Sequence, residues 1–395
     1  MQLELERLLR DSRVQSAAAC ARATDERTLQ DQAELSGIAA PPFAEEERGR
    51  RMGEMMADAG LVRVRTDGIG NVLSDLPGTA VGPPLVMAAH LDTVFPADVD
   101  VTVSREFGLL RGPGISDDAR GLAVLLAVAR CLQEGAVSCT CPVLFAATVG
   151  EEGLGDLRGV KHLFQRGEGR DASGFVSVDG AGLQRLVVKA LGSRRFRITA
   201  RGPGGHSWID WGLPNPIHVL ADVVSRLTRL ELPSAPITTL TVARWGGGKS
   251  INAIPQDAWL EIDTRSESDD RLTDLERSIR EVVDACDAAA DHGGASVQLT
   301  IEVLGHRPGG HTPSETALLR AAVAATRHVG AEPLFTASST DANVPMSVGI
   351  PAVTVGGGGE AGQAHTTEEW YRNTKGVEGV QRALYTLLLA AGVAG

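Results

Sequence analysis

The sequence predicts a larger α/β domain, with a mostly parallel sheet covered by helices, and a smaller α+β domain inserted into it. Near-continuous apolar runs such as LVMAA and VLFAATV alternate with amphipathic segments, as a sheet buried on both faces requires. The middle of the chain instead has half-exposed strands in the order β-α-β-β-α-β, which is that of a ferredoxin-like unit. A length of 395 residues also exceeds the usual size of one domain.

The elements of the larger domain follow from hydrophobic periodicity and from Pro and Gly stops. Helical periodicity in residues 1–36 ends before Pro41-Pro42, and an amphipathic helix at 44–59 ends at Gly60. The next elements are strands 61–65, 71–76, 84–89, 141–148 and 174–178, with helices at 122–133 and 160–165. After the insertion come helix 315–328, strand 352–355 and helix 375–391.

The inserted domain is expected over residues 187–304, which leaves 1–186 and 305–395 as the two parts of the larger domain. Its first strand, 194–200, alternates polar and apolar side chains, which is typical of a sheet with one exposed face. The remaining elements are helix 214–230, strands 238–243 and 258–264, helix 269–288 and strand 296–303.

Composition excludes several classes of function. Lys and Arg number 38 against 50 Asp and Glu, and this net charge of −12, without a basic run, argues against nucleic-acid or anionic-membrane binding. No apolar run approaches the roughly 18–20 residues of a membrane helix, and the first residues lack the apolar core of a signal peptide. The five cysteines are scattered, as in a reducing compartment, so we expect a cytoplasmic protein whose metal ligands, if any, are His and carboxylates.

Two motifs place polar side chains where a site is expected. VMAAHLDTV (86–94) ends a predicted strand with His90 and Asp92, which point to the same side because they stand two residues apart. Ligands of open α/β sheets bind beyond the carboxyl ends of strands, although H-x-D alone is equally typical of a structural pair. GPGISDDARG (112–121) places Asp117 and Asp118 before a predicted helix, and helix capping explains one of these acids better than both.

Three further motifs follow buried strands or glycine runs. They are ATVGEEGLGD with Glu151 and Glu152, FVSVDG with Asp179, and VGGGGEAGQAH with His365. Adjacent carboxylates repel each other unless a cation neutralises them, and a set of carboxylates and imidazoles without thiolates suits Zn, Mn or Co. Six or seven such groups exceed the ligands of one tetrahedral ion. A two-metal site with a shared carboxylate and a bridging water fits better, and an uncoordinated carboxylate could act as general base.

These motifs, together with IAAPPFAEEE (38–47) and DGIGNV (67–72), resemble the M20 family of metallopeptidases and amidohydrolases. That family includes tripeptide aminopeptidases, glutamate carboxypeptidases, acetylornithine deacetylases and aminoacylases. The resemblance implies two divalent ions per subunit, zinc first and otherwise cobalt or manganese. It assigns His90, Asp117 and Asp179 to one ion, and Asp117, Glu152 and His365 to the other. Asp92 would orient His90, and Glu151 would be the general base that passes a proton to the leaving amine.

The same resemblance makes the inserted domain a lid and dimerisation domain. His206 in GPGGHSW would stabilise the oxyanion, usually from the partner subunit of a homodimer. Asn252 in SINAIP and Arg265 in DTRS resemble the lid positions that bind the substrate carboxylate. A turn histidine and an exposed strand-end arginine are the alternative interpretations of His206 and Arg265. Trp208 and Trp211 are expected to narrow or reshape the substrate pocket.

The resemblance leaves the substrate open. We favour hydrolysis of the amide bond of a small peptide, because EEGLGDLRG and GGHSW look closer to tripeptide aminopeptidases than to acetylornithine deacetylases. An N-acyl-amino-acid deacylase or a carboxypeptidase would use the same metal core. A non-catalytic relative that binds amino acids or peptides is a remote alternative, since Glu151 and all the expected ligands are present.

Overall fold

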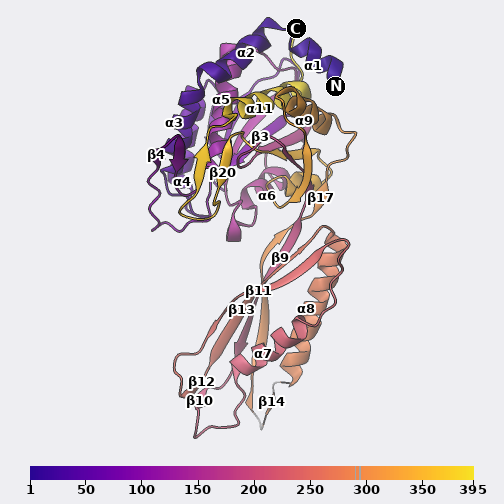
Figure 1. Cartoon of the computed structure of the whole chain (residues 1–395). Coiled ribbons are helices and arrows are strands. Elements are labelled where there is room, and N and C mark those ends of the chain that lie inside the picture. The colour runs from indigo at the N-terminus through magenta and orange to yellow at the C-terminus, as the bar shows by residue number, and fades with distance from the viewer. Residues whose placement is uncertain (290, 293–294) are drawn as a thin grey trace. The chain divides into compact units, whose positions relative to one another are not determined.

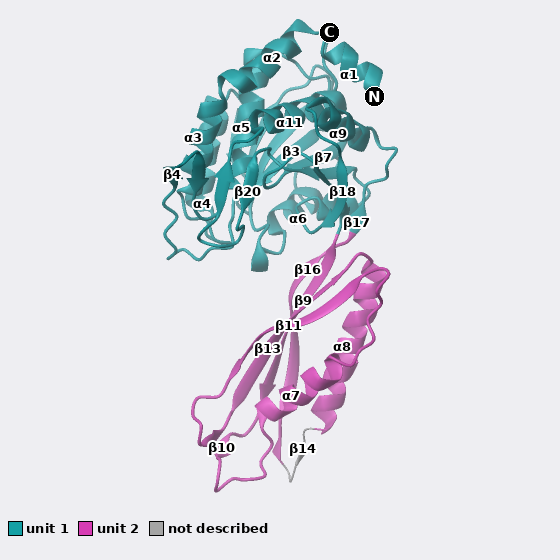
Figure 2. Ribbon diagram, viewed as in Figure 1, with its two compact units in different colours: residues 1–190, 310–395 teal, residues 191–309 magenta. Residues whose placement is uncertain are grey.

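The computed structural model of the chain describes residues 1–289, 291–292 and 295–395, and it divides into two compact units (Figures 1 and 2). Unit 1 consists of Met1–Ala190 and Gly310–Gly395, and unit 2 is Leu191–Gly309. The insertion expected at 187–304 starts and ends a few residues earlier than unit 2. The difference arises because strand β8 (Arg185–Ala190) pairs within the sheet of unit 1.

Unit 1 is an α/β unit built on one large sheet. Its helices are α1 (Gln2–Leu8), α2 (Ser12–Ala23), α3 (Asp25–Ser36), α4 (Glu46–Asp58), α5 (Ala119–Glu134), α6 (Arg158–Gln165), α9 (Ala317–His328), α10 (Asn343–Ser347) and α11 (Gly376–Ala391). The sheet contains β1 (Val62–Thr66), β2 (Val72–Leu76), β3 (Leu85–His90), β6 (Val143–Thr148), β7 (Gly174–Val178), β8, β17 (Gly310–His311), β18 (Leu334–Ser338) and β19 (Ala352–Val355). A smaller sheet contains β4 (Ser104–Glu106), β5 (Leu109–Arg111), β20 (Glu360–Gly362) and β21 (Trp370–Arg372).

The centre of the large sheet is parallel. Its strands run in the order β1-β2-β6-β3-β7-β19-β8-β17, and neighbouring strands from β6 to β19 are parallel. The outer pairs β1·β2, β2·β6, β8·β19 and β8·β17 are antiparallel. The carboxyl ends of β6, β3, β7 and β19 therefore meet at one edge of the sheet, where ligands of α/β sheets bind.

Both faces of the large sheet are covered, which explains its apolar strands. In β3, Leu85, Met87 and Ala89 pack into the core beneath α5 and α11, whereas Val86 and Ala88 pack against α6. Successive side chains of a strand point to opposite faces, so a strand buried on both sides must be apolar throughout. Figure 1 shows these helices on either side of the sheet.

Unit 2 has the topology of a ferredoxin-like fold. Its four long strands, β9 (Gly192–Arg201), β11 (Thr238–Gly247), β13 (Asp257–Ser266) and β16 (Gln298–Arg307), form an antiparallel sheet in the order β11-β13-β9-β16. Helices α7 (Pro216–Leu227) and α8 (Asp269–Ala289) pack on it. Short pairs are formed by β10 (Gly205–His206) with β12 (Ala253–Ile254), and by β14 (Asp291–His292) with β15 (Ala295–Ser296).

The predicted fold class is confirmed, and the differences lie in short or exposed elements. The helical region at 1–36 is three helices, because the chain breaks after Leu8 and Asp11 caps α2 by accepting from the Arg13 N–H at 2.9 Å. Sequence patterns missed β8, which continues almost directly into β9, and β18, whose Leu334 and Phe335 are exposed. No helix in the described part of the chain is long and apolar enough to cross a membrane.

Candidate metal centre

The predicted acids and histidines of unit 1 gather at the carboxyl edge of the four central strands. His90 is the last residue of β3, Glu151 and Glu152 follow β6, Asp179 follows β7, and His365 lies in the segment after β19. All except His365 are at least largely buried, so their charges face one another with little water between them.

Asp117 lies between the two histidines. His90 Nε2 is 3.0 Å from Asp117 Oδ1, and His365 Nε2 is 3.1 Å from Asp117 Oδ2. His365 Nε2 is also 3.1 Å from Glu152 Oε1. Ligand atoms of His90, Asp117 and Glu152 all lie within 4.8 Å of one another. One carboxylate thus uses its two oxygens toward two different imidazoles, as a carboxylate shared by two cations would.

Asp92 acts on the site through both its backbone and its side chain. The His90 Nδ1–H donates to the backbone carbonyl of Asp92 at 2.9 Å, while the Asp92 carboxylate is 3.7 Å from Nδ1. That carboxylate accepts from the backbone N–H groups of Glu151 at 2.9 Å and Glu152 at 2.7 Å. Asp92 therefore fixes the ring of His90, directing Nε2 at Asp117, and also fixes the backbone that carries both glutamates.

The neighbouring acids Asp117 and Asp118, joined by a cis peptide bond, have separate tasks. Asp118 caps α5 by accepting from the Gly121 N–H at 2.9 Å, and it also accepts from the N–H groups of His90 and Gly180, each at 3.1 Å. A Cβ on Gly121 would lie 2.3 Å from the Asp118 carboxylate, so glycine is required there. Capping therefore accounts for Asp118, and Asp117 is left to face the histidines.

The pKa shifts describe a cluster that needs positive charge. Burial raises the pKa of Asp92, Asp118 and Asp179 above the ordinary range of aspartate. Burial also opposes ionisation of Asp117, but hydrogen bonds with His365 and His90 outweigh it and lower its pKa. Hydrogen bonds to Asp117, then to Glu152, raise the pKa of His365 to about 10. A positive charge between the imidazole and the carboxylate therefore stabilises each of these contacts. A divalent ion supplies more positive charge there than a proton does.

Asp179 borders an open cavity of about 530 Å³ beside this cluster. Asp117, the loop Gly180–Gly182 and the segment Gly359–Ala364 form the other walls. Arg185 also lines the cavity, with Nη2 3.8 Å from Asp179 Oδ1 and within hydrogen-bond distance, 3.4 Å, of the Asp179 carbonyl oxygen. The cavity offers a substrate access to the acids from solvent.

Sequence reasoning missed two buried acids near the site. Asp341 is 1 % exposed, accepts a hydrogen bond from Thr148 Oγ1 just ahead of the glutamate pair, and has its pKa raised to about 6 by burial. Glu369 is fully buried and accepts hydrogen bonds from the loop that carries Asp117. Neither follows a predicted strand, so the strand-end pattern that identified the other acids could not find them.

Unit 2 brings two of its predicted residues together and separates the third. The β10·β12 pair sets His206 opposite Ala253, and the Ser207 N–H donates to the Asn252 carbonyl at 3.1 Å. The Trp208 N–H donates to His206 Nδ1 at 3.2 Å, which leaves the proton of a neutral ring on Nε2. Arg265 lies near the other end of β13, opposite Ser193, with its Nε 2.8 Å from Asp263 Oδ2.

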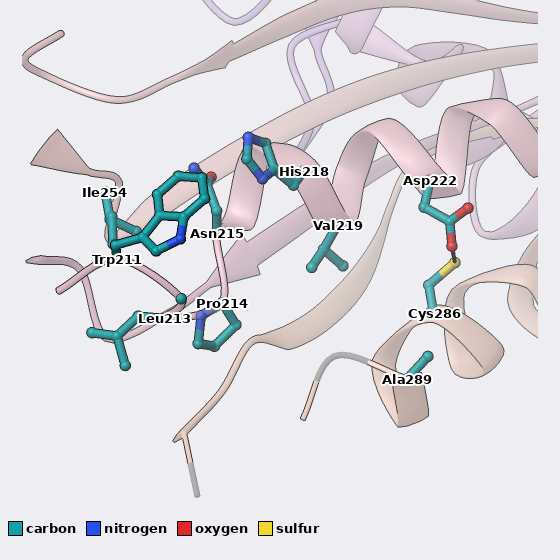
Figure 3. A pocket seen from close by; sticks show the side chains of 11 residues that line it. Trp211, Leu213, Pro214, Asn215, His218, Val219, Asp222, Ile254, Cys286 and Ala289 are labelled. Carbon is teal, nitrogen blue, oxygen red and sulfur yellow. Dashed lines mark hydrogen bonds between the residues drawn. The ribbon is translucent and has the colours of Figure 1, made fainter. Parts of the chain in front are cut away.

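A second pocket, of about 390 Å³, lies within unit 2 near α7 (Figure 3). Trp211 and His218 line it, and Cys286 Sγ–H donates to Asp222 Oδ2 at 3.5 Å. Burial raises the pKa of Cys286 to about 11, so this thiol is protonated at neutral pH and a poor nucleophile. None of the predicted metal ligands is among the described residues that line this pocket.

The chain is similar to known metallopeptidases and deacylases. Residues 86–390 match the model of peptidase family M20/M25/M40. A putative succinyl-diaminopimelate desuccinylase of Mycobacterium tuberculosis (strain CDC 1551 / Oshkosh) is 27% identical over 301 residues, which cover 72% of this chain and 77% of that protein. The crystal structure of a tripeptidase from Staphylococcus aureus subsp. aureus Mu50 aligns with a TM-score of 0.73 and 23% identity, covering 92% of this chain and 98% of the other.

Another similar structure is that of a metal-binding protein. The structure of the YxeP protein of Bacillus subtilis, described as a dinuclear metal-binding peptidase from the M20 family, aligns with a TM-score of 0.67 and 16% identity. The alignment covers 93% of this chain and 98% of that one. At such identities the structural similarities establish the fold, while the family match over residues 86–390 extends across most of the chain.

Proposed function

The chain belongs to peptidase family M20/M25/M40 and is a metal-dependent amide hydrolase, and we propose that it cleaves the amide bond of a small peptide. The resemblance read from the motifs is thereby confirmed at the level of the family. The observation that carries the proposal is the Asp117 carboxylate held between two imidazoles at 3.0 and 3.1 Å, at the carboxyl edge of the sheet.

We assign His90, Asp117 and Asp179 to one divalent ion and Asp117, Glu152 and His365 to the other. This donor set fits such ions, because carboxylate oxygens and imidazole nitrogens of four of the five residues already meet at hydrogen-bond distances. Asp179 lines the same cavity as Asp117. Divalent ions in such a site polarise the substrate carbonyl and lower the pKa of water. Glu151 is the proposed general base, which accepts a proton from the attacking water and donates it to the leaving amine. Asp92 holds Glu151 and His90 in place.

N-acyl-amino-acid deacylation is the second candidate, and carboxypeptidase activity shares the same core. The cavity beside Asp179 favours deacylation of an acidic acyl group, because Arg185 presents a guanidinium within reach of a bound carboxylate. The similarity to succinyl-diaminopimelate desuccinylases points in the same direction.

A substrate panel tests the function and separates the candidates. The full chain is stripped of metal with a chelator, reloaded with zinc, cobalt or manganese, and given tripeptides, N-acetyl amino acids and N-succinyl amino acids. A peptidase hydrolyses the tripeptides with the highest kcat/KM, and a deacylase prefers an acylated substrate. Absence of metal-restored hydrolysis across the whole panel would contradict both.

Arg185→Gln separates the candidates further. If deacylation of acidic acyl groups is the activity, we expect KM for the N-succinyl substrate to rise about tenfold or more, since a charge-assisted pair is lost. KM for an N-acetyl substrate should change little. The exposed Arg166→Gln is the matched control. An equal rise in KM for both substrates would instead indicate that Arg185 supports Asp179 and does not bind the acyl group.

We propose zinc as the physiological metal, a cytoplasmic location and a homodimer formed through unit 2. The dimer is supported by the placement of His206 and Asn252 at one end of the unit and Arg265 near the other. Arg265 stands eight positions after Asp257 along β13, and at about 3.3 Å per residue this separation is on the order of 26 Å. A substrate that contacts both ends therefore needs a second subunit. The cytoplasmic location is supported by five scattered cysteines, all of them free thiols.

Trp208 and Trp211 give a test of the proposed role of unit 2. Their side chains are 85% and 86% exposed, which is costly for tryptophan unless a substrate or a partner subunit covers them. The Trp208→Ala, Trp211→Ala double variant is expected to change relative kcat/KM across the substrate panel. Phe107→Ala, which removes an exposed aromatic ring from unit 1, is the control. Unchanged substrate preference in the double variant would contradict the role.

A further inference from the structure

Glu369 is a fully buried carboxylate that contacts the loop leading to Asp117. Its Oε1 accepts from the Ser116 N–H at 2.8 Å, the Ser116 hydroxyl at 2.6 Å and the Asp117 N–H at 3.0 Å. Its Oε2 accepts from the Gly114 N–H at 3.1 Å. A carboxylate has only acceptors, and here all four partners can donate, so the charge and the shape of the side chain both match the loop.

Strand pairing brings this loop beside the segment that carries His365. β5 pairs with β21, with Arg111 opposite Trp370, so the loop that follows β5 and the segment that precedes β21 leave the small sheet at the same end. The Gly112 N–H also donates to the Glu369 carbonyl at 3.0 Å. Glu369, which stands four residues after His365, thus holds the loop that carries Asp117 next to the His365 segment.

The Glu369 hydrogen bonds support the contact between His365 Nε2 and Asp117 Oδ2, which are 3.1 Å apart. The two residues are far apart in the sequence, and His365 is about half exposed, so packing of its own side chain holds it weakly. The Glu369 contacts instead fix the backbone at Asp117, and the Glu369 N–H donates at 3.2 Å to the carbonyl of Thr366, the residue after His365. Residues that support ligands in this way preorganise a metal site before the ion arrives.

We propose that Glu369 is a positioning residue of the metal centre, which sets the separation of Asp117 and His365 and thereby raises the affinity for divalent ions. The inference rests on the proposed ligand set. Glu369 itself faces only loop donors in the contacts that the described residues make, so it acts through Asp117 and His365. A residue with only a structural role would stabilise the fold without changing the affinity for metal ions.

The test is a Co²⁺ titration of the metal-free full chain, followed by visible absorbance. Glu369→Gln places an amide NH₂ among N–H donors, and we expect the Co²⁺ dissociation constant to rise about 10- to 100-fold, with an altered absorbance spectrum. Glu368→Gln is the matched control, because its neighbouring side chain is exposed, and it should stay within about twofold of wild type. Unfolding temperatures of the metal-free proteins are measured in parallel.

Ser116→Ala removes a single donor to Glu369 and covers the case in which Glu369→Gln does not fold. It should raise the dissociation constant by a smaller factor, up to about tenfold. Lower unfolding temperatures in the metal-free variants, with Co²⁺ affinity and spectrum equal to wild type, would overturn the positioning role. Failure of the wild-type chain to bind Co²⁺ would overturn the proposed function itself, and the inference with it.

Discussion

Replacing Glu151 by alanine should lower kcat by about 10²- to 10⁴-fold, which is the usual contribution of a general acid–base group. The side chain is 6% exposed and its backbone N–H is held by Asp92 at 2.9 Å, so its position does not depend on a metal ion. Because Glu151 is not among the assigned ligands, the variant should keep two divalent ions. Turnover of the best panel substrate and metal content of the purified protein are the two measurements.

The exposed Glu47 of α4 provides the control for Glu151. Glu47→Ala removes the same carboxylate from a solvent-facing helix position and should leave turnover unchanged. Full residual activity of Glu151→Ala would eliminate the general-base role. Loss of metal together with activity would instead make Glu151 a ligand.

Asp117→Asn should abolish the two-metal site. Both oxygens of Asp117 face imidazoles, and an amide offers one acceptor and one donor in their place, so it cannot serve two cations. We expect divalent-ion affinity to fall by more than about 100-fold, beyond the range typical of residues that merely support ligands. Hydrolysis should fall in parallel. Calorimetric titration with Zn²⁺ measures affinity and stoichiometry together.

The control for Asp117 is Asp98→Asn, at an exposed loop position of the same unit. It removes an equal charge and should change neither stoichiometry nor turnover. If Asp117→Asn still bound two ions with near wild-type affinity, Asp117 could not be the shared ligand. The assignment would then have to be rebuilt around Glu152 or Asp179.

The sequence predicted where the acids and histidines gather, because polar residues that follow buried parallel strands must lie at the carboxyl edge of the sheet. Spacing alone could not distinguish the roles of Asp117 and Asp118, since both fit a helix start, and only the family resemblance assigned Asp117 to the metal ions. It also assigned Asp92 to His90 alone, whereas the carboxylate holds the glutamate backbone and the carbonyl holds the ring. Such hydrogen bonds depend on atomic positions that no spacing encodes.

Sequence patterns could not predict Glu369 or the boundary of unit 2, for a different reason. Glu369 follows an exposed turn and precedes a three-residue strand, so neither periodicity nor a strand end marks it. The boundary of unit 2 was placed early because β8 runs into β9 with one residue between them, and the antiparallel partner of β8, β17, comes more than a hundred residues later. Long-range pairing of this kind leaves no local signal.

The position of β19 in the sheet of unit 1 has a consequence for biosynthesis. β19 lies between β7 and β8, yet it begins at residue 352, whereas β7 ends at residue 178 and β8 at residue 190. At about 5–20 residues per second, on the order of 10–35 s pass on the ribosome between β7 and the strand that completes it. During that time the edge of the largely apolar strand β7 is available for pairing with other nascent chains. The open edge of β7 is therefore an aggregation-prone site during synthesis, before β19 pairs with it.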